Sequence, residues 1–316
     1  MTEKIRIGIS SCLLGEMVRF DGGHQLDRYL RDTLGHYFEY LPVCPEVELG
    51  LPIPRETLRL VEADQGVRLV FSRSGEDITA RMLAWAERRV LELEREGLCG
   101  FIFKAKSPSS GMERVKLYDR NGVPAKQGVG LFARVFMAHF PLVPVEEDGR
   151  MHDPHLRENF IDRVFTFKRW RDLLARVPTA AGVVDFHTRH KLLLLSHSPE
   201  LYREMGKLVG RAGTLPAGEL LDCYQGLLMK AMRLHPSVRK QVNVLHHLLG
   251  YFKRQLSTDE KQEALEQIEL YRQGSVPLIV PVSLINHYVR KYREPYLSGQ
   301  FYLRPHPVEL QLRNHV

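Results

Sequence analysis

The pattern of hydrophobic and polar residues changes character near the middle of the chain. In the first half, short β-branched or apolar runs alternate with segments of helical periodicity. Strands are expected at residues 5–10, 38–43, 67–71, 100–105 and 142–145, and helices at residues 78–96 and 128–140. This alternation predicts an α/β fold with a mostly parallel, Rossmann-like sheet that carries helices on both faces.

The second half has helical periodicity throughout. Helices are expected at residues 155–176, 182–196, 200–210, 217–233, 237–254, 258–273 and 282–293. Ser198 precedes a first-turn proline, and Ser257 with Glu260 has the spacing of a capping box. We therefore expect an α/β domain over residues 1–163 and an all-α domain over residues 164–316, with a boundary blurred by a helical connector.

Composition narrows the class of protein. The chain has 316 residues, of which 44% are hydrophobic, so two ordinary domains with buried cores are expected. No apolar run approaches the ~20 residues of a membrane span. Met1–Lys4 leads directly into a strand-like run and does not resemble a signal peptide. Four cysteines are too few for a disulfide framework, which favours a cytoplasmic protein with reduced thiols.

The net charge of +7 is unevenly distributed. Residues 1–163 hold 23 Lys and Arg against 25 Asp and Glu, whereas residues 164–316 hold 22 against 13. The halves therefore carry −2 and +9. A basic second half is compatible with an ordinary solvated surface. It is also typical of a polyanion-binding module attached to a near-neutral catalytic domain.

Three polar segments each follow a predicted strand. They are Ser10-Ser11-Cys12, Cys44-Pro45-Glu46 and the turn Ser107–Gly111. The carboxyl ends of parallel strands line the ligand crevice of an open α/β sheet. These three segments should therefore converge on one crevice, and two of them bring a cysteine.

A pair of cysteines in a crevice has several interpretations. Two buried structural thiols are the plainest, and a disulfide is disfavoured in the cytosol. Zinc needs four ligands, and the usual close cysteine spacing is absent. An iron–sulfur cluster with one open iron needs a third thiolate. Cys99 precedes its strand and is expected roughly 20 Å from the turn at Ser107, and Cys223 is expected in the helical core.

Four motifs of the first half together resemble the TudS-type thiouracil desulfidase family. They are Ser10–Gly15, Val18–Gly23, Cys44–Glu46 with Gly50–Arg55, and Ser107–Gly111. In that family the last motif ends in Ser-Pro-Ser-Cys-Gly, and its cysteine is the third ligand of a [4Fe-4S] cluster. The resemblance implies that Cys12 and Cys44 are the first two ligands here. Ser110 occupies the position of the third ligand.

The same resemblance implies roles for other residues of the crevice. Glu46 corresponds to the acid/base group that moves protons as water replaces sulfur, and Ser107 to a residue that positions substrate or water. The remaining substrate-binding candidates are Arg19, Asp21, Ser109 and Gly111.

Simpler interpretations remain open for these residues. Glu46 is also placed to form an ion pair with Arg19 or Arg55. Ser107 precedes a proline, where a turn-capping hydroxyl is common. Asp21-Gly22-Gly23 is most simply a tight turn.

Three motifs of the second half are similar to the helical domain of YbgA-like proteins. They are Asp185–Lys191, Asn243–Phe252 and Tyr302–Pro307. Fusions of the two domains resemble the RudS group, which implies removal of sulfur from 4-thiouridine in transfer RNA. The helical domain would then bind the RNA.

A basic segment of the helical half supports that expectation. His187, Arg189, His190 and Lys191 fall within little more than one helical turn. Buried histidines are one interpretation, and a metal site would lack a third ligand. A phosphate-contacting surface is the interpretation we adopt. Its other members are Lys253, Arg254, Arg290 and Lys291.

Ser110 decides what the sequence predicts for catalysis. A serine hydroxyl seldom ionises and is a hard donor, so we expect the cluster to bind weakly or not at all. An engineered replacement is the favoured origin of Ser110, and a divergent natural copy is the alternative. Two rival functions remain: a non-catalytic RNA-binding protein, and a desulfidase of free thiolated nucleobases. The sequence does not indicate an oligomeric state.

Overall fold

The computed structural model describes residues 4–64, 66–176 and 178–315. The first three residues, on which part of the signal-peptide expectation depends, lie outside this range. The chain divides into two compact units, residues 1–156 and 157–316. The division falls seven residues before the expected boundary at 163, within the first two turns of helix α4, Pro154–Ala175.

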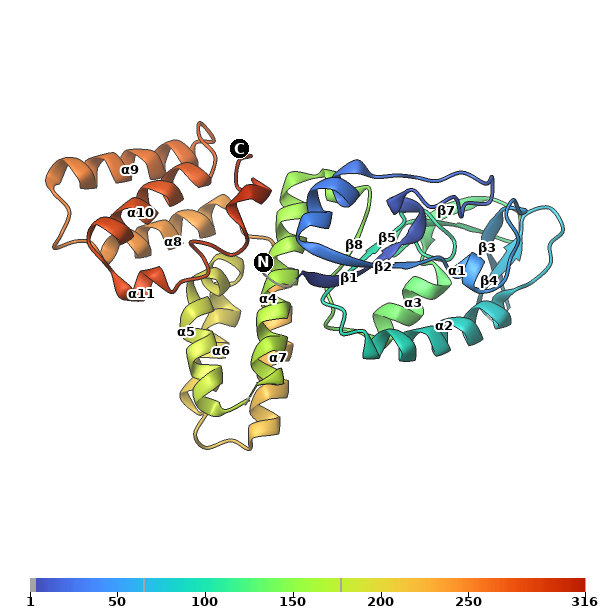
Figure 1. Cartoon of the computed structure of the whole chain (residues 1–316), viewed down its shortest axis with the longest axis horizontal. Helices are drawn as coiled ribbons and strands as arrows, with labels where there is room; N and C mark the ends of the chain where they lie inside the picture. The colour runs from blue at the N-terminus through green and yellow to red at the C-terminus, as the bar shows by residue number, and fades with distance from the viewer. Residues whose placement is uncertain (1–3, 65, 177, 316) are drawn as a thin grey trace. The chain divides into compact units, whose positions relative to one another are not determined.

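A parallel four-stranded sheet forms the centre of the first unit (Figure 1). Its strand order is β2-β1-β5-β8, and every neighbouring pair is parallel. The strands are β1 (Ile5–Ser10), β2 (Phe38–Val43), β5 (Phe101–Phe103) and β8 (Val145–Glu147). The expected α/β class is therefore confirmed. The last strand lies three residues later than its apolar run predicts, because β8 ends in two buried glutamates.

Two helices pack against this sheet through aromatic side chains. They are α2 (Thr79–Arg95) and α3 (Leu131–His139), which lie side by side (Figure 1). Phe132 of α3 contacts both Phe101 of β5 and Trp85 of α2. Gly8 of β1 has no room for a side chain, because a Cβ there would come within 2.2 Å of the Phe101 ring. The strand ends that carry the polar motifs are thus held by a closely packed core.

A second, smaller sheet has the order β4-β3-β6-β7. It comprises β3 (Leu58–Ala63), β4 (Gly66–Phe71), β6 (Val115–Tyr118) and β7 (Pro124–Gly128). The expected strand at residues 67–71 is present as β4, but the other three strands were not predicted. β7 is exposed along most of its length and has no apolar alternation to reveal it. Because β7 extends to Gly128, α3 begins three residues later than expected.

Short helical turns complete the first unit. They are η1 (Ser11–Leu14), η2 (Tyr29–Thr33), η3 (Leu34–His36), α1 (Pro45–Glu48) and η4 (Arg150–His152). η1 and α1 follow β1 and β2 directly, so both cysteine motifs adopt a helical turn immediately after their strand.

All regular secondary structure among the described residues of the second unit is helical, as expected. After α4 come α5 (Ala180–His197), α6 (Pro199–Gly210), α7 (Ala217–Arg233), α8 (Val238–Gly250), α9 (Thr258–Arg272), α10 (Ile279–Lys291), α11 (Pro295–Ser298) and η5 (Val308–Leu310). The Ser198 hydroxyl accepts a hydrogen bond from the Leu201 amide, and Ser257 and Glu260 form the expected capping box. The predicted helix at 237–254 ends earlier, at Gly250.

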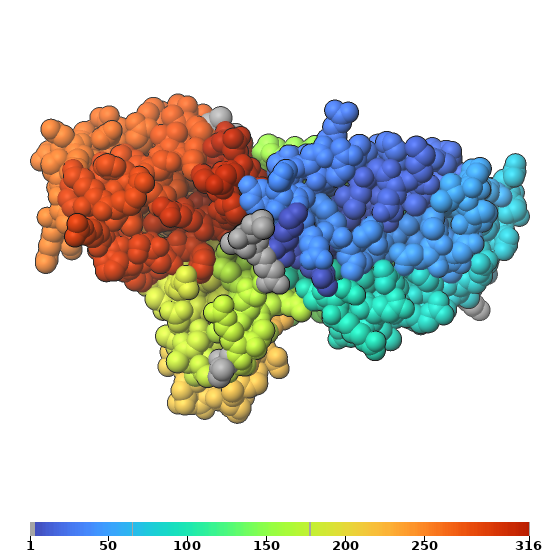
Figure 2. Space-filling model, viewed as in Figure 1, coloured from blue at the N-terminus to red at the C-terminus, as the bar shows by residue number. Residues whose placement is uncertain are grey.

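The core of the helical unit is built around Trp170, which stacks on Tyr224 and meets Phe186 edge to face. Residues beyond about 290 form part of the surface of this unit, beside the segment of α9 and α10 (Figure 2). Cys223 was expected in the core but is exposed, because Tyr224 is the residue that α7 turns inward. Among the described residues, no helix is long and apolar enough to cross a membrane.

Candidate active site

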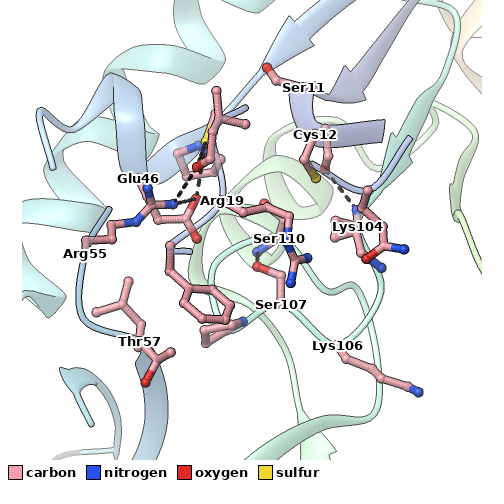
Figure 3. A pocket seen from close by; sticks show the side chains of 18 of the residues that line it. Ser11, Cys12, Arg19, Glu46, Arg55, Thr57, Lys104, Lys106, Ser107 and Ser110 are labelled. Atoms are coloured by element: carbon pink, nitrogen blue, oxygen red, sulfur yellow. Dashed lines mark hydrogen bonds and ion pairs between the residues drawn. The ribbon is translucent and has the colours of Figure 1, made fainter. Parts of the chain in front are cut away.

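The three polar segments line one cavity of about 350 Å³ in the first unit (Figure 3). The walls come from the residues after β1, β2 and β5, together with a loop that precedes β3. Cys12, Cys44, Glu46, Ser107 and Ser110 are all among the lining residues. The tertiary structure therefore brings together the residues that the sequence places behind three separate strands.

Cys12 lies on η1, immediately beyond β1, and is 7% exposed. Burial raises the pKa of this thiol to about 11, and the nearby Lys104 ammonium only partly opposes the effect. The thiol is therefore protonated near neutral pH in the metal-free chain.

Cys44 is the N-cap residue of α1 and also lines the cavity. Its Sγ lies 3.6 Å from Glu46 Oε2 and 4.0 Å from the Val18 carbonyl oxygen. Burial, followed by the negative charge of Glu46, raises the pKa of this thiol to about 12. Both thiols must lose a proton before they can bind a metal.

Glu46 is held in place from two sides. The Ser109 hydroxyl donates a hydrogen bond to Glu46 Oε1 over 2.6 Å, and Arg55 Nη2 lies 3.9 Å from Oε2. Arg55 is itself fixed, because Nη2 donates to the Val18 carbonyl oxygen over 2.9 Å. Of the two ion-pair partners considered for Glu46, Arg55 is close, whereas the Nε of Arg19 is 3.6 Å from Asp21 Oδ1.

The turn Ser107–Gly111 is closed by its own hydroxyl groups. Ser107 Oγ accepts hydrogen bonds from the backbone amides of Ser110, over 3.1 Å, and Ser109, over 3.4 Å. It also lies 2.9 Å from Ser109 Oγ, which continues the hydrogen-bonded chain to Glu46. Ser107 therefore caps this turn, as the simpler interpretation predicts, while it also lines the cavity.

The start of α3 packs directly on this turn. The Ser109 carbonyl accepts from the Phe132 amide over 2.9 Å, and Gly130 donates to Gly111 O over 2.7 Å. A Cβ at Gly130 would come within 2.5 Å of the Ser109 carbonyl carbon. A Cβ at Gly111 would come within 2.5 Å of Val115 Cγ2. Both glycines are required by close packing.

Three buried carboxylates lie at the end of β8, and two of them hold the same loop from behind. Asp148 accepts from the Ala105 amide over 2.7 Å and pairs with Lys104 Nζ at 2.8 Å. Glu147 accepts from the Met112 amide over 2.8 Å, and Glu146 accepts from Arg150 Nε over 2.6 Å. Sequence reasoning missed these residues. The run Glu146-Glu147-Asp148 after an apolar stretch was the available signal.

The four residues expected to contact substrate separate into two groups. Arg19 lines the cavity, whereas Asp21, Ser109 and Gly111 are not among its lining residues. Asp21 Oδ1 accepts from the Gly23 amide over 3.0 Å, which closes the tight turn considered for this motif. Ser109 is fully buried, and Gly111 packs against Val115. Their positions fit support of the site better than contact with substrate.

The donor set does not fit a cluster held by three thiolates. Two thiols and the Ser110 hydroxyl face the cavity, and Cys99 is not among its lining residues. Ser110 is 3% exposed, and its Oγ lies 3.4 Å from Ser109 Oγ. Within the described part of the chain, no group of three or more His, Cys, Asp or Glu side chains could hold a metal ion. A cysteine at position 110 would supply the missing sulfur with little change in volume.

His187 and His190, expected on an RNA-binding surface, are buried in the helical unit. His190 is 1% exposed, donates from Nδ1 to the Phe186 carbonyl and accepts from Arg169 Nε at Nε2. His187 lies 3.2 Å from the Tyr224 hydroxyl, and burial lowers its pKa to about 4. Both are neutral core residues, so direct contact with phosphate is not available to them.

The other residues of the expected RNA surface are more accessible. Arg189, Lys253, Arg254, Arg290 and Lys291 are exposed, and Lys191 is half-buried. The charge of Lys291 is compensated, because its Nζ lies 2.6 Å from Glu260 Oε1. Arg189 lies over the Phe301 ring at 4.6 Å.

Each part of the chain matches a known family model. Residues 7–148 match the family model of 2-thiouracil desulfurase, and residues 191–307 match a family of unknown function, DUF1722. The α/β unit with the cysteine-bearing cavity is thus similar to 2-thiouracil desulfurases, and the helical unit matches the DUF1722 model.

The chain belongs to the YbgA family. It is 34% identical over 155 residues to the uncharacterized protein YbgA of Escherichia coli K12, covering 48% of this chain and 90% of that protein. It is 27% identical over 108 residues to the uncharacterized protein YbbK of Bacillus subtilis 168, covering 33% and 71%. A solved structure, the [4Fe-4S]-dependent thiouracil desulfidase TudS, is 29% identical, with a TM-score of 0.39, and the match covers 48% of this chain and 95% of that one.

Proposed function

We propose that this chain has the architecture of a desulfidase that acts on a thiolated uracil base in RNA. Ser110 occupies the position of one ligand of its cluster. With all three cysteine ligands present, the reaction would replace the sulfur of 4-thiouridine in transfer RNA by oxygen and release sulfide. The observation that carries the proposal is the convergence of Cys12, Cys44, Glu46 and Ser110 on one cavity.

The size and polarity of the cavity support a base as the bound group. Its volume of about 350 Å³ lies within the ~300–1,000 Å³ typical of small-molecule sites. Arg19, Arg55, Lys104 and Lys106 line it against two glutamates, Glu46 and Glu56. A basic cavity favours a group that carries phosphate, and a base inside an RNA reaches such a cavity only when it is unstacked.

The hydrogen bonds around Glu46 support its role in proton transfer. The carboxylate faces the cavity and is oriented by the Ser109 hydroxyl and by Arg55. A positioned carboxylate beside the reacting group contributes about 10²–10⁴-fold to a proton-transfer step. Ser107 lines the same wall, where its hydroxyl is shared between the turn and the cavity.

The serine at position 110 is the reason to expect little iron in this chain. The family resemblance implies three cysteine ligands, and this site offers two. A serine side chain is a hard oxygen donor whose hydroxyl is hydrogen-bonded within the turn. The chain as it stands therefore lacks the complete ligand set for a cluster held by three thiolates.

The test compares the unaltered chain with Ser110→Cys after anaerobic reconstitution with iron and sulfide. We expect Ser110→Cys to retain about four irons per chain with the absorbance of a cluster, and the unaltered chain to retain substantially less. Sulfide release from RNA that contains 4-thiouridine should appear only with Ser110→Cys.

Cys223→Ser in the Ser110→Cys background is the matched control, because Cys223 is exposed on α7 of the other unit. It should leave iron content unchanged, whereas Cys12→Ser should abolish it. If Ser110→Cys gains neither iron nor sulfide release, the desulfidase proposal is wrong.

A second candidate function is a non-catalytic RNA-binding protein, and Ser110 itself favours it. The two candidates differ in the Ser110→Cys result, because a protein that has lost catalysis altogether would bind RNA without releasing sulfide. A third candidate is a desulfidase of free bases. Sulfide release from free 4-thiouracil, supplied in place of RNA, distinguishes it from the other two.

A further inference from the structure

The helical unit contains a cavity of its own. Its volume is about 940 Å³, and its walls are α5, α6 and α8 with the segment between α7 and α8. Polar and cationic residues make up much of its lining. Among them are Lys191, Arg203, Arg239, Lys240 and Tyr251.

The charge of this cavity is strongly one-sided. Four Lys or Arg side chains line it against a single carboxylate, Glu200. Arg203 and Arg239 are exposed, and no carboxylate of the described residues lies within ion-pair distance of either. Lys240 Nζ donates to the His197 carbonyl oxygen over 2.6 Å, which fixes its ammonium at the cavity wall.

This arrangement differs from that of other basic residues in the same unit. Lys291 is neutralised by Glu260, and Arg272 is paired with Glu269 at 2.6 Å. Cations that line one cavity without carboxylate partners repel one another, and a bound polyanion relieves that repulsion. The cavity therefore has the electrostatics of a phosphate-binding site.

An aromatic surface adjoins the cations. Tyr251 lines the cavity and is 41% exposed. Its ring stacks on Tyr296 with centroids 5.2 Å apart, and Lys191 Nζ lies 4.7 Å from the Tyr296 ring centre. The Tyr251 ring is thus supported by the Tyr296 ring, and part of the Tyr251 ring is accessible to a ligand.

Cations that follow a phosphate backbone, next to an aromatic ring on which a base stacks, are the two elements of single-strand recognition. A duplex keeps its bases stacked inside and presents phosphates on a convex surface, which suits a hollow poorly. We propose that this cavity binds an unpaired stretch of RNA, with Arg203 and Arg239 on phosphates and Tyr251 stacked on a base.

This proposal rests on the proposed function for its choice of RNA as the polyanion. It assigns the binding to a different surface from the one expected from sequence, since of that set only Lys191 lines the cavity. It also gives the helical unit a task that does not depend on Ser110.

The experiment measures binding of a fluorescently labelled single-stranded RNA 12-mer to the full chain by anisotropy at several salt concentrations. We expect the double variant Arg203→Gln/Arg239→Gln to bind about 10-fold more weakly or worse. The slope of log affinity against log salt should become shallower by about 1.4, at ~0.7 for each lost phosphate contact.

Arg211→Gln/Lys261→Gln is the matched control. It removes the same charge from exposed residues of the same unit that do not line the cavity. We expect its affinity to stay within about 2-fold of the unaltered chain. Tyr251→Ala should weaken binding by about 5- to 100-fold, whereas Tyr251→Phe keeps the ring and should bind nearly as well.

The outcomes separate this inference from the proposed function. If the unaltered chain binds RNA and both double variants bind equally well, the cavity assignment is wrong while an RNA substrate stands. If the unaltered chain binds no RNA, both are wrong. Equal affinity for a blunt duplex of the same length would contradict the single-strand assignment. Circular dichroism melting confirms that each variant is folded.

Discussion

The two cavities of this protein differ in how their charged groups are satisfied. In the α/β unit, Glu46 is bound by Ser109, and Lys104 is paired with Asp148. In the helical unit, Arg203 and Arg239 face the cavity without a carboxylate partner among the described residues. The first cavity is organised before any ligand arrives, and the second is organised for a partner that brings the opposite charge.

The difference shows how each site depends on its surroundings. Hydrogen-bonded residues held by a packed core keep their geometry to within the tolerance that proton transfer needs. Phosphate binding tolerates looser geometry, because it depends on charge at a distance. Four predictions test this contrast, from the largest expected effect to the smallest.

Replacing Glu46 should have the largest effect. In the Ser110→Cys background, Glu46→Gln should lower sulfide release by about 10²–10⁴-fold, because the amide cannot accept a proton. Iron content should be unchanged, since Glu46 supplies no sulfur ligand. The exposed Glu62→Gln serves as control. Full activity of the Glu46→Gln variant would show that Glu46 has no role in proton transfer.

The thiols of the first cavity should react slowly at neutral pH. The pKa of Cys12 is raised to about 11 and that of Cys44 to about 12 by burial, so near pH 8 their thiolate fractions are about 100-fold or more below those of ordinary thiols. Alkylation mapped by mass spectrometry should modify the exposed Cys223 first. Labelling of Cys12 and Cys44 should accelerate as pH rises toward these values. Equal rates for all three cysteines near pH 8 would show that the cavity is open and solvated.

Removing the support behind the turn should destabilise the α/β unit. Asp148→Ala leaves the Ala105 amide and the Lys104 ammonium without their partner and should cost about 3 kcal/mol. Each unit contains one tryptophan, so Trp85 in a Trp170→Phe background reports urea unfolding of the first unit alone. Asp64→Ala, which removes an exposed ion pair with Arg120, should cost less than about 1 kcal/mol. Similar losses in the free energy of unfolding for the two variants would show that Asp148 does not support the turn.

Mild acid should selectively destabilise the helical unit. Burial lowers the pKa of His197 to about 4, and it also lowers the pKa values of His187 and His190. The unfolded chain takes up protons below about pH 6.5 while the folded unit does not, so stability falls as pH falls from about 6.5 toward 4. Between about pH 7 and about pH 5 the loss should be about 2 kcal/mol for His197 alone.

Trp170 fluorescence in a Trp85→Phe background measures this change by urea unfolding at each pH. His197→Gln should flatten the pH dependence, although it lowers stability at every pH, because the His197 ring is packed in the core. A pH dependence that His197→Gln leaves unchanged would show that His197 titrates normally.

Much of the α/β unit could be predicted from local pattern. β1 and β2 have the expected bounds, and α2 differs from its expected range by one residue at each end. β3, β6 and β7 were missed, because strands of the small, partly exposed sheet lack a continuous apolar run. The helices were predicted well, since each has an amphipathic face or a capping residue that acts locally.

Only the residues that line the candidate site could be predicted from the sequence, not those that support it from behind. Strand topology and the motifs indicate that Cys12, Cys44, Glu46 and Ser107 meet. They do not reveal Asp148 behind the loop, because buried carboxylates at a strand end look like a solvated charged run. In the helical half, His187 and His190 were expected at a surface. A histidine within an apolar helix does not reveal which side faces the core until the helices pack.

The sequence by itself determined the chemistry that this protein can offer. It specified two thiols, one carboxylate and a serine in place of a third thiol, each behind a strand, as well as a basic second half. Only the tertiary structure decided which charges are compensated. The balance between desolvation and pairing depends on neighbours far apart in the chain, as Lys104 and Asp148 are. The same dependence leaves Arg203 and Arg239 uncompensated beside a hollow that three separate helices enclose.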